Sequence, residues 1–572
     1  MQLIARPLTC ILMAIPVLAM AQTETYEPIP LSDLSAFEQP AANWMLQESM
    51  TVLPMPKAKP KFQKGAGILV GTPGTELHTK VKAKDLKLSL DFMVTPGASA
   101  ILTLPGGGEV VLSDSYKQQQ LDRHTSGYSG LFPTQNAAKA PGLWQHLELA
   151  YDGQVDNLPK SVRLNTLKLN GVTVLEAVYL PKTQDISTAG SSLSLKVNQG
   201  TMAFKNLGYQ LLKNQQPLSL TGLSYKVYGE KATLSDLKDP VKEGVSELLT
   251  QEVTDGMKNF ILLYTGTVEV KEAGEYTFSS QYDGSTFILE IDGQEVINGG
   301  GSNSQNSITG SVTLPKGNHP LKIIYSRFPW RAGSLGLMVS KPGIRAYHLH
   351  ALSSLPIPPP KPYIQVDADE EPAMVRSFIQ LPYEKTKRTK CISVGSPQGW
   401  NYSMDLEKGA LIQAWRGAFA DVTEMWYQRG EPQLLEPAGL NLLLTGKSTV
   451  ASLENQQAAW PDSSNIDYLG YNIDNAGYPV YRFTVDGHPI TDKLTSTTNG
   501  LERTITAPKA NSLSVLLTRA DTITAIGKGL YQVDGQYYIQ IDSKLKPIIR
   551  KSVDKQELIL PLNGQVQYTL IW

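Results

Sequence analysis

Two carboxylates beside one short apolar stretch could do chemistry together. Glu109 opens the stretch EVVLS, and Asp114 follows it directly. Cleavage of a glycosidic bond typically uses two carboxyl groups, roughly 5 Å apart when the configuration is retained and farther apart when it is inverted. Residues five apart on a regular strand face opposite sides, so a shared site needs a bulge or a strand end that re-aims Asp114. On that condition we predict Glu109 and Asp114 as catalytic residues. The alternatives are a solvated strand residue for Glu109 and a capped turn for Asp114.

Aromatic side chains near these carboxylates are candidates to stack on a sugar ring. Tyr116 comes two positions after the second carboxylate, Tyr128 lies in the Gly-containing loop that follows, and Trp144 enters the next alternating stretch. We predict all three as substrate-binding residues, although Trp144 also fits a packed core aromatic. His124 and His146 are too isolated in the sequence to be predicted as ligands.

The elements that must position these side chains are strands. Period-two alternation bounded by Gly, Asn, Asp and Pro dominates the chain, as in LKLSLDF at 86–92. The stretch LKLNGVTV at 167–174 contains an Asn-Gly pair, which is a strong hairpin signal. One window, 239–255, spaces its valines and leucines as a short amphipathic helix does. The sequence therefore predicts an all-β, multidomain fold with one short helix in that window.

Composition excludes several classes of protein. A chain of 572 residues with 41% hydrophobic and 18% charged residues can form three to four domains with buried cores. Its 52 basic and 53 acidic residues give a net charge of −1, which argues against a nucleic-acid partner. The two cysteines, Cys10 and Cys391, exclude a disulfide scaffold, a thiolate zinc cluster, c-type haem and an iron–sulfur protein. We expect no metal and no other cofactor.

The first 21 residues predict export. Arg6 precedes an apolar run from Ile11 to Val17, and the small residues Ala19 and Ala21 fit signal-peptidase cleavage after Ala21. The run is shorter than the roughly 20 residues of a membrane span, so no membrane span is expected. We expect a periplasmic or secreted bacterial protein whose mature chain keeps a single thiol.

Two shifts in composition divide the rest of the chain. The polar stretch KNQQPLSL at 213–220 follows a completed strand pattern. The stretch LPIPPPKPY at 355–363 is typical of a semi-rigid polyproline-like spacer. We therefore predict a signal peptide at 1–21, domains at 22–212, 218–345 and 363–572, and a Pro-rich linker at 346–362.

The first domain carries four motifs in order. They are EVVLSDSY (109–116), SGYSGLFPTQNAAKAPGLW (126–144), LNGVTV (169–174) and QGTMAFKNL (199–207). The ordered set resembles the 3-keto-disaccharide hydrolase family. That resemblance implies a concanavalin-like jelly roll, related to laminarinases, that acts on or binds glucosides, including those with a ketone at the third carbon. A ketone would allow cleavage by removal of the neighbouring proton, which needs only one good base.

The second domain combines GEYTF (274–278), DGSTFILEIDGQEV (283–296) and LPKGNHPLKIIY (314–325). These stretches resemble the anthrax protective antigen-type β-domain, a β-sandwich attached to many bacterial glycosidases and adhesins. Some members bind sugars through calcium held by adjacent aspartates, and hard cations need several oxygen ligands. Tyr282 precedes Asp283, so the aspartate pair is missing and calcium is not expected. The resemblance leaves Asp283 and Trp330 as candidates for a shallow sugar contact.

The third domain, expected to be β-rich, has no established activity to suggest. It contains ISVGSPQGWNYSMD (392–405) and AWRGAFADVT (414–423), and this run resembles a β-rich region beside cytochrome and sugar-dehydrogenase modules in environmental bacteria. An aromatic–charge cluster there fits either a sugar contact or a core with a paired arginine. Its members are Trp415, Arg416, Asp421, Trp426 and Arg429.

Two hypotheses about function follow, and carbohydrate is the expected partner in both. In the first, the N-terminal jelly roll is a glycoside hydrolase or lyase, with 3-keto-glycosides among its substrates. In the second, the protein is a non-catalytic glycan-binding or scaffolding component of a polysaccharide-utilisation system. Such a component would deliver substrate to partner enzymes of sugar degradation.

Overall fold

The structure, a computed structural model, describes most of the chain. The described residues are 26–155, 158–283, 286–300, 308–330, 333–355, 362–427, 433–455, 457–461, 464–508 and 512–572. The expected signal peptide, residues 356–361 of the expected Pro-rich linker and Arg429 lie outside these ranges. Strands are the dominant regular element of the described residues, which contain a single short α-helix, α1 (Thr423–Trp426), so the all-β, multidomain prediction is confirmed.

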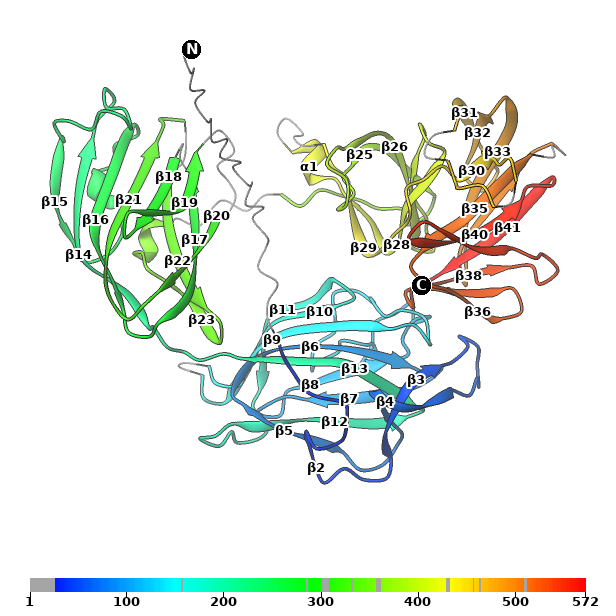
Figure 1. Ribbon diagram of the computed structural model, residues 1–572, viewed down its shortest axis with the longest axis horizontal. Coiled ribbons are helices and arrows are strands. Elements are labelled where there is room, and N and C mark those ends of the chain that lie inside the picture. Colours follow the sequence, from blue (N-terminus) through cyan, green and yellow to red (C-terminus); the bar gives the residue numbers. More distant parts are fainter. Residues whose placement is uncertain are drawn as a thin grey trace, which may run out of the picture.

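The first domain is a sandwich of two antiparallel sheets (Figure 1). The larger sheet has the order β11 (Val172–Pro181), β10 (Ser161–Leu169), β9 (Gln145–Asp152), β6 (Asp85–Val94), β13 (Met202–Leu211), β4 (Lys61–Gly71) and β3 (Trp44–Thr51), with β1 (Glu27–Pro28) paired to β13. The smaller sheet has the order β2 (Phe37–Glu38), β5 (Leu77–Ala83), β12 (Ser191–Gln199), β7 (Ser99–Thr103) and β8 (Glu109–Ser113).

Alternation along β6 and β9 decides which side chains of the larger sheet can meet a ligand. Leu88 and Leu90 of β6 and Leu147 of β9 are buried in the core between the sheets. Because successive side chains point to opposite faces, Asp91 and His146 lie on the outer face of the sheet.

The second domain is also a sandwich. One sheet has the order β15 (Lys242–Ser246), β14 (Leu218–Tyr228), β16 (Phe260–Val270), β21 (Gly317–Arg327), β18 (Thr286–Ile291) and β19 (Gln294–Gly300). The other has the order β20 (Ile308–Leu314), β17 (Gly274–Asp283), β22 (Ser334–Lys341) and β23 (Ile344–His348). Two 3-10 turns, η1 (Glu252–Thr254) and η2 (Leu352–Ser354), lie at its edge.

The helix predicted at 239–255 is wrong. Residues 242–246 form β15 and pair with β14 from Lys242↔Val227 to Ser246↔Leu223. Val245, which the helical spacing would place on the buried face, is 84% exposed. Pairing with a neighbouring strand outweighed a weak local periodicity, because helix propensity is overridden by tertiary context.

The third domain contains three sheets (Figure 1). The first has the order β24 (Gln365–Val366), β28 (Ala410–Asp421), β27 (Trp400–Asp405), β26 (Arg388–Gly395) and β25 (Ala373–Ile379), with β29 (Glu436–Leu443) paired to β28. The second has the order β30 (Val450–Ser452), β35 (Leu513–Ala520), β40 (Lys555–Pro561) and β39 (Ile548–Ser552). The third has the order β31 (Ile466–Ile473), β32 (Pro479–Val485), β33 (His488–Thr497), β34 (Gly500–Thr506), β41 (Gln565–Ile571), β38 (Tyr537–Ile541), β37 (Leu530–Val533) and β36 (Ile523–Gly527).

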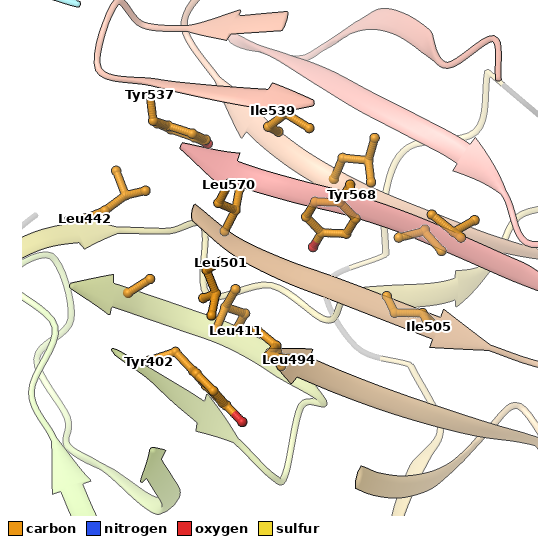
Figure 2. Close-up of a cluster of buried hydrophobic side chains, with 14 of the residues drawn as sticks. Tyr402, Leu411, Leu442, Leu494, Leu501, Ile505, Tyr537, Ile539, Tyr568 and Leu570 are labelled. Atoms are coloured by element: carbon orange, nitrogen blue, oxygen red, sulfur yellow. The ribbon is translucent and has the colours of Figure 1, made fainter. Parts of the chain in front are cut away.

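One hydrophobic core joins these sheets. Figure 2 shows Tyr402 and Leu411 from the first sheet facing Leu501 and Leu570 from the third. The same buried cluster includes Leu143 of the first domain, so the core of the third domain continues across the domain boundary.

An arginine joins the first and second domains. Arg345 in β23 donates from both Nη atoms to the Asp152 carboxylate of β9, at 2.8 and 2.6 Å, and its Nη2 lies 3.3 Å from Asp85. The segment that connects the two domains pairs with the start of β23. The Lys213 backbone N donates to Gly343 O, and Arg345 N donates to Lys213 O.

Replacing Arg345 by Ala is expected to loosen this boundary. Asp152 would lose its bidentate partner, and because Arg345 is partly exposed the cost is about 1 kcal/mol, or about fivefold in the population of undocked chains. Tryptic cleavage after Lys213 should therefore be about fivefold faster. Lys322→Ala, which removes an exposed pair with Glu290 inside the second domain, is the control. Equal cleavage of Arg345→Ala and the wild type would contradict the expectation.

Candidate functional site

The structure does not bring the two predicted carboxylates together. Strand β8 pairs with β7 in an unbroken register from Thr103↔Glu109 to Ser99↔Ser113, so no bulge re-aims Asp114 within this pair of strands. Just past the strand end, the Asp114 carboxylate is bound to Gly97 N and does not turn back toward Glu109. Five residues of extended chain place the Cα atoms of Glu109 and Asp114 about 16 Å apart, too far for the two side chains to reach the roughly 5 Å separation of a retaining pair. The prediction of a paired-carboxylate site is wrong.

Each carboxylate instead follows its simpler interpretation. Glu109 is exposed at the start of an edge strand. Asp114 follows the end of β8 and accepts a hydrogen bond from Gly97 N at 2.8 Å. This bond links the end of β8 to the turn between β6 and β7. Burial raises the pKa of Asp114.

Tyr116 lies in an interface between domains and not in an open groove, so its prediction as a sugar contact is also wrong. It is 6% exposed, and its hydroxyl donates to Asn499 O of the third domain at 3.0 Å. The Arg416 guanidinium lies 4.9 Å from its ring, and the Trp400 ring meets it edge-on at 6.2 Å. We call residues 115–144, which carry Tyr116 and Leu143, the docking loop.

Tyr128 lies elsewhere on the docking loop. Its ring is half-buried and 5.7 Å from that of Phe132, which is exposed, and its backbone bonds to Val111 of β8. The backbone at Tyr128 therefore runs along the free edge of β8 in the smaller sheet, because Gly127 N also donates to Val111 O.

Trp144, by contrast, borders a cluster of polar side chains on the outer face of the larger sheet. Alternation along the start of β9 turns Trp144, His146 and Glu148 to this face, and β6 places Asp91 directly opposite His146. His146 Nδ1 lies 2.7 Å from Asp91 Oδ1, and His146 Nε2 lies 3.4 Å from Glu148 Oε1. We call Asp91, His146 and Glu148 the imidazole cluster.

Hydrogen bonding sets the charges within the imidazole cluster. Burial alone would raise the pKa of Asp91, but hydrogen bonds from His146 and from Asn206 Nδ2, at 2.6 Å, outweigh it and lower that pKa. The hydrogen bond to Asp91 in turn raises the pKa of His146. The His146 side chain is 43% exposed, so part of the imidazole ring is open to a ligand.

A small buried apolar cluster, with Trp144 packed against it, lies on the same face of the larger sheet as the imidazole cluster. Lys205 Nζ lies 4.2 Å from the centre of the Trp144 ring, and Trp144 packs on a small patch of buried side chains. The patch consists of Met50, Ile68, Val70, Met93 and Ala203. An aromatic ring beside an imidazole held by carboxylates can bind a sugar ring and move a proton at it.

Replacing Asp91 by Asn is expected to lower the pKa of His146. The carboxylate favours the charged imidazolium, and the amide does not. The His146 signal in an NMR titration should therefore titrate at lower pH than in the wild type. Glu148→Gln should shift it in the same direction but less, since the more distant Glu148 contributes less than Asp91 to the raised pKa. A larger shift in Glu148→Gln would contradict this order.

Sequence reasoning missed the imidazole cluster because its members come from different strands. Asp91 and His146 are 55 residues apart and meet only through the register of β6 with β9. The available signal was local: His146 and Glu148 are two polar residues on one side of an alternating strand that begins at a tryptophan.

The remaining predicted residues divide between surface and core. In the second domain Trp330 is 74% exposed and stacks on Phe328 at 4.8 Å, and the side chain of Asp283 lies outside the described residues. In the third domain Trp415 is fully buried and donates from Nε1 to Phe419 O at 2.6 Å, whereas Trp426 is exposed.

Two findings concern metal sites and membrane spans in the part of the chain that the structure describes. No group of three or more His, Cys, Asp or Glu residues there is arranged to hold a metal ion. Within the same ranges, none of the helices has the length and apolar character needed to cross a membrane.

Two family models match the chain. The 3-keto-alpha-glucoside-1,2-lyase-like domain matches residues 32–208, and the PA14 domain matches residues 220–347. No curated protein matches the chain. The matches indicate a carbohydrate-active protein whose first domain is similar to glycoside hydrolases and lyases and whose second domain is similar to PA14 domains.

Solved structures resemble single domains of the chain. A candidate glycosyl hydrolase from Parabacteroides distasonis is 15% identical, with 33% of this chain and 100% of that chain covered and a TM-score of 0.23. A PA14 sugar-binding domain from an RTX adhesin is 19% identical, with 23% and 95% covered and a TM-score of 0.19. Similarity at this level carries no argument about the site.

Proposed function

We propose that this protein cleaves the glycosidic bond of 3-keto-glucosides by elimination, with His146 as the base. The matches to a lyase-like domain and to a PA14 domain in one chain support the proposal. The observation that carries the proposal is the imidazole cluster, a half-exposed histidine held at 2.7 Å by a carboxylate on a sheet face that also carries Trp144. A ketone at the third carbon makes the proton on the second carbon acidic, so a single base is sufficient.

The geometry supports one order of events. With the Nδ1 proton donated to Asp91, the unprotonated Nε2 of neutral His146 takes the proton from the second carbon, and the electrons of that C–H bond form the enolate. The enolate then expels the glycosidic oxygen from the first carbon. The imidazolium that forms has carboxylates on both sides, Asp91 at Nδ1 and Glu148 at Nε2, which stabilises its charge. The Trp144 ring stacks on the sugar.

The test uses p-nitrophenyl α-glucoside and its 3-keto derivative with the full chain. Release of p-nitrophenolate is expected from the keto sugar and not from the ordinary glucoside, since only the ketone makes the second carbon acidic. Equal rates on both sugars would indicate ordinary hydrolysis and overturn the elimination, and no release from either would overturn the enzyme proposal.

A specific observation in the second domain favours the alternative of glycan binding without catalysis. The stacked pair of Phe328 and Trp330 presents an exposed aromatic surface of the kind that holds sugar rings. Binding of both sugars in calorimetry with no product would select this alternative.

Two further parts of the proposal concern the setting of the reaction. Residues 1–21 have the pattern of an export signal, so we place the reaction in the periplasm or outside the cell. A ketone on a glucoside must first be formed by oxidation of a hydroxyl, so a sugar-oxidising partner enzyme would supply the substrate.

A further inference from the structure

A turn of the third domain lies against the edge of the imidazole cluster. Between β37 and β38, Gly535 O accepts a hydrogen bond from Trp144 N at 3.2 Å. The turn is fixed within its own domain, because Asp534 Oδ1 accepts from Thr522 N at 2.7 Å and Gln536 N donates to Val533 O at 2.8 Å. The third domain therefore places a turn, fixed by its own hydrogen bonds, against Trp144 of the first domain.

Lys139 of the docking loop is held from both domains at this point. Its backbone N donates to Gln145 Oε1 at 3.0 Å, and its Nζ lies 3.5 Å from Trp144 O. The same Nζ donates to Gln536 Oε1 of the third domain. Burial lowers the pKa of Lys139 to about 8, and the nearby Asp91 carboxylate acts in the opposite direction. Lys139 is therefore a cation within electrostatic reach of the imidazole cluster.

We propose that the third domain completes the sugar site of the first, with the turn 534–536 as one wall and Gln536 as the residue that positions the Lys139 ammonium. The inference rests on the proposed function and deepens it. Removing a proton beside a ketone places negative charge on the ketone oxygen, and an ammonium positioned in advance at the site stabilises that charge. Lys139 supplies the charge, and Gln536 acts through it.

The chain offers a matched control for this role. Gln532, four residues before Gln536, also reaches the docking loop, and its Nε2 donates to Gly142 O at 3.0 Å. Both glutamines cross the same boundary between domains, but only Gln536 contacts Lys139. Loss of docking alone would affect both variants alike.

The experiment measures kcat/KM of the full chain on p-nitrophenyl 3-keto-α-glucoside. Gln536→Ala is expected to lose about tenfold, the value of one hydrogen bond to a charged group, and Gln532→Ala less than twofold. Gln536→Glu places a carboxylate against the ammonium, which raises the pKa of Lys139, so the alkaline limb of its pH profile should move to higher pH.

Four outcomes would overturn the inference. Equal losses in Gln536→Ala and Gln532→Ala would show that Gln536 only holds the two domains together. An unmoved alkaline limb in Gln536→Glu would show that Lys139 does not take part in the reaction. Full activity of Gln536→Ala in an active protein would refute this inference and leave the proposed function standing. A wild type without turnover would refute the proposed function first, and the inference with it.

Discussion

Replacing His146 by Asn is expected to lower kcat on p-nitrophenyl 3-keto-α-glucoside by about 1000-fold, within the range that general-base catalysis contributes. Asn keeps a side chain that can bond to Asp91 but has no nitrogen that accepts a proton from carbon. The half-exposed position makes few core contacts, so the fold should be kept and KM should change little.

A second histidine of the same domain provides the control. His124 lies exposed on the docking loop, where Asp122 Oδ1 accepts from its backbone N, and it is remote in sequence from the imidazole cluster. His124→Asn should therefore keep kcat within about twofold of the wild type. Wild-type turnover by His146→Asn would exclude this histidine as the base, whatever the substrate.

Replacing Arg416 by Ala should have the largest effect on stability, about 3 kcal/mol. Its guanidinium lies over the rings of Tyr116 and Trp400, at 4.9 and 5.6 Å. It also donates to the carbonyl oxygens of Tyr116 at 2.9 Å and Ala138, both in the docking loop. Burial lowers the pKa of Arg416 to about 10, a sign of how little water reaches it. Alanine would leave these carbonyls without a donor.

Calorimetry is the appropriate measurement, because a multidomain chain does not unfold as one unit when its interfaces fail. The first and third domains should melt in a shared transition in the wild type and in separate transitions in Arg416→Ala. Arg482, which donates to Leu469 O within the third domain, is exposed, so Arg482→Ala should leave the melting profile unchanged. A shared transition in Arg416→Ala would show that the interface does not depend on this residue.

The strands were predictable from the sequence because their signal is local. Leu86, Leu88 and Leu90 alternate with polar residues, and the structure buries them as that pattern requires. The helix predicted at 239–255 failed because its local signal was weak and did not decide the structure. Its periodicity was weak, and the pairing partner that converts it into β15 lies in another segment of the chain.

The site was less predictable, because it depends on which strands become neighbours. Glu109 and Asp114 were selected for their closeness in sequence, yet an extended strand separates residues five positions apart. Asp91 and His146 meet across 55 residues, and Tyr116 meets Asn499 across 383. Only Trp144, among the aromatics predicted in the first domain, borders the imidazole cluster.

The docking loop also determines when folding of the molecule can be completed. Its partners Asn499, Gln532 and Tyr538 come 383 to 397 residues later in the chain. At a ribosomal rate of about 5 to 20 residues per second, roughly 20 to 80 s pass between synthesis of the loop and synthesis of the surface that covers it. During that interval apolar side chains such as Leu143 have no cover. The last step of maturation is therefore closure of this boundary, and a chain truncated before its final strands would carry an exposed, aggregation-prone loop.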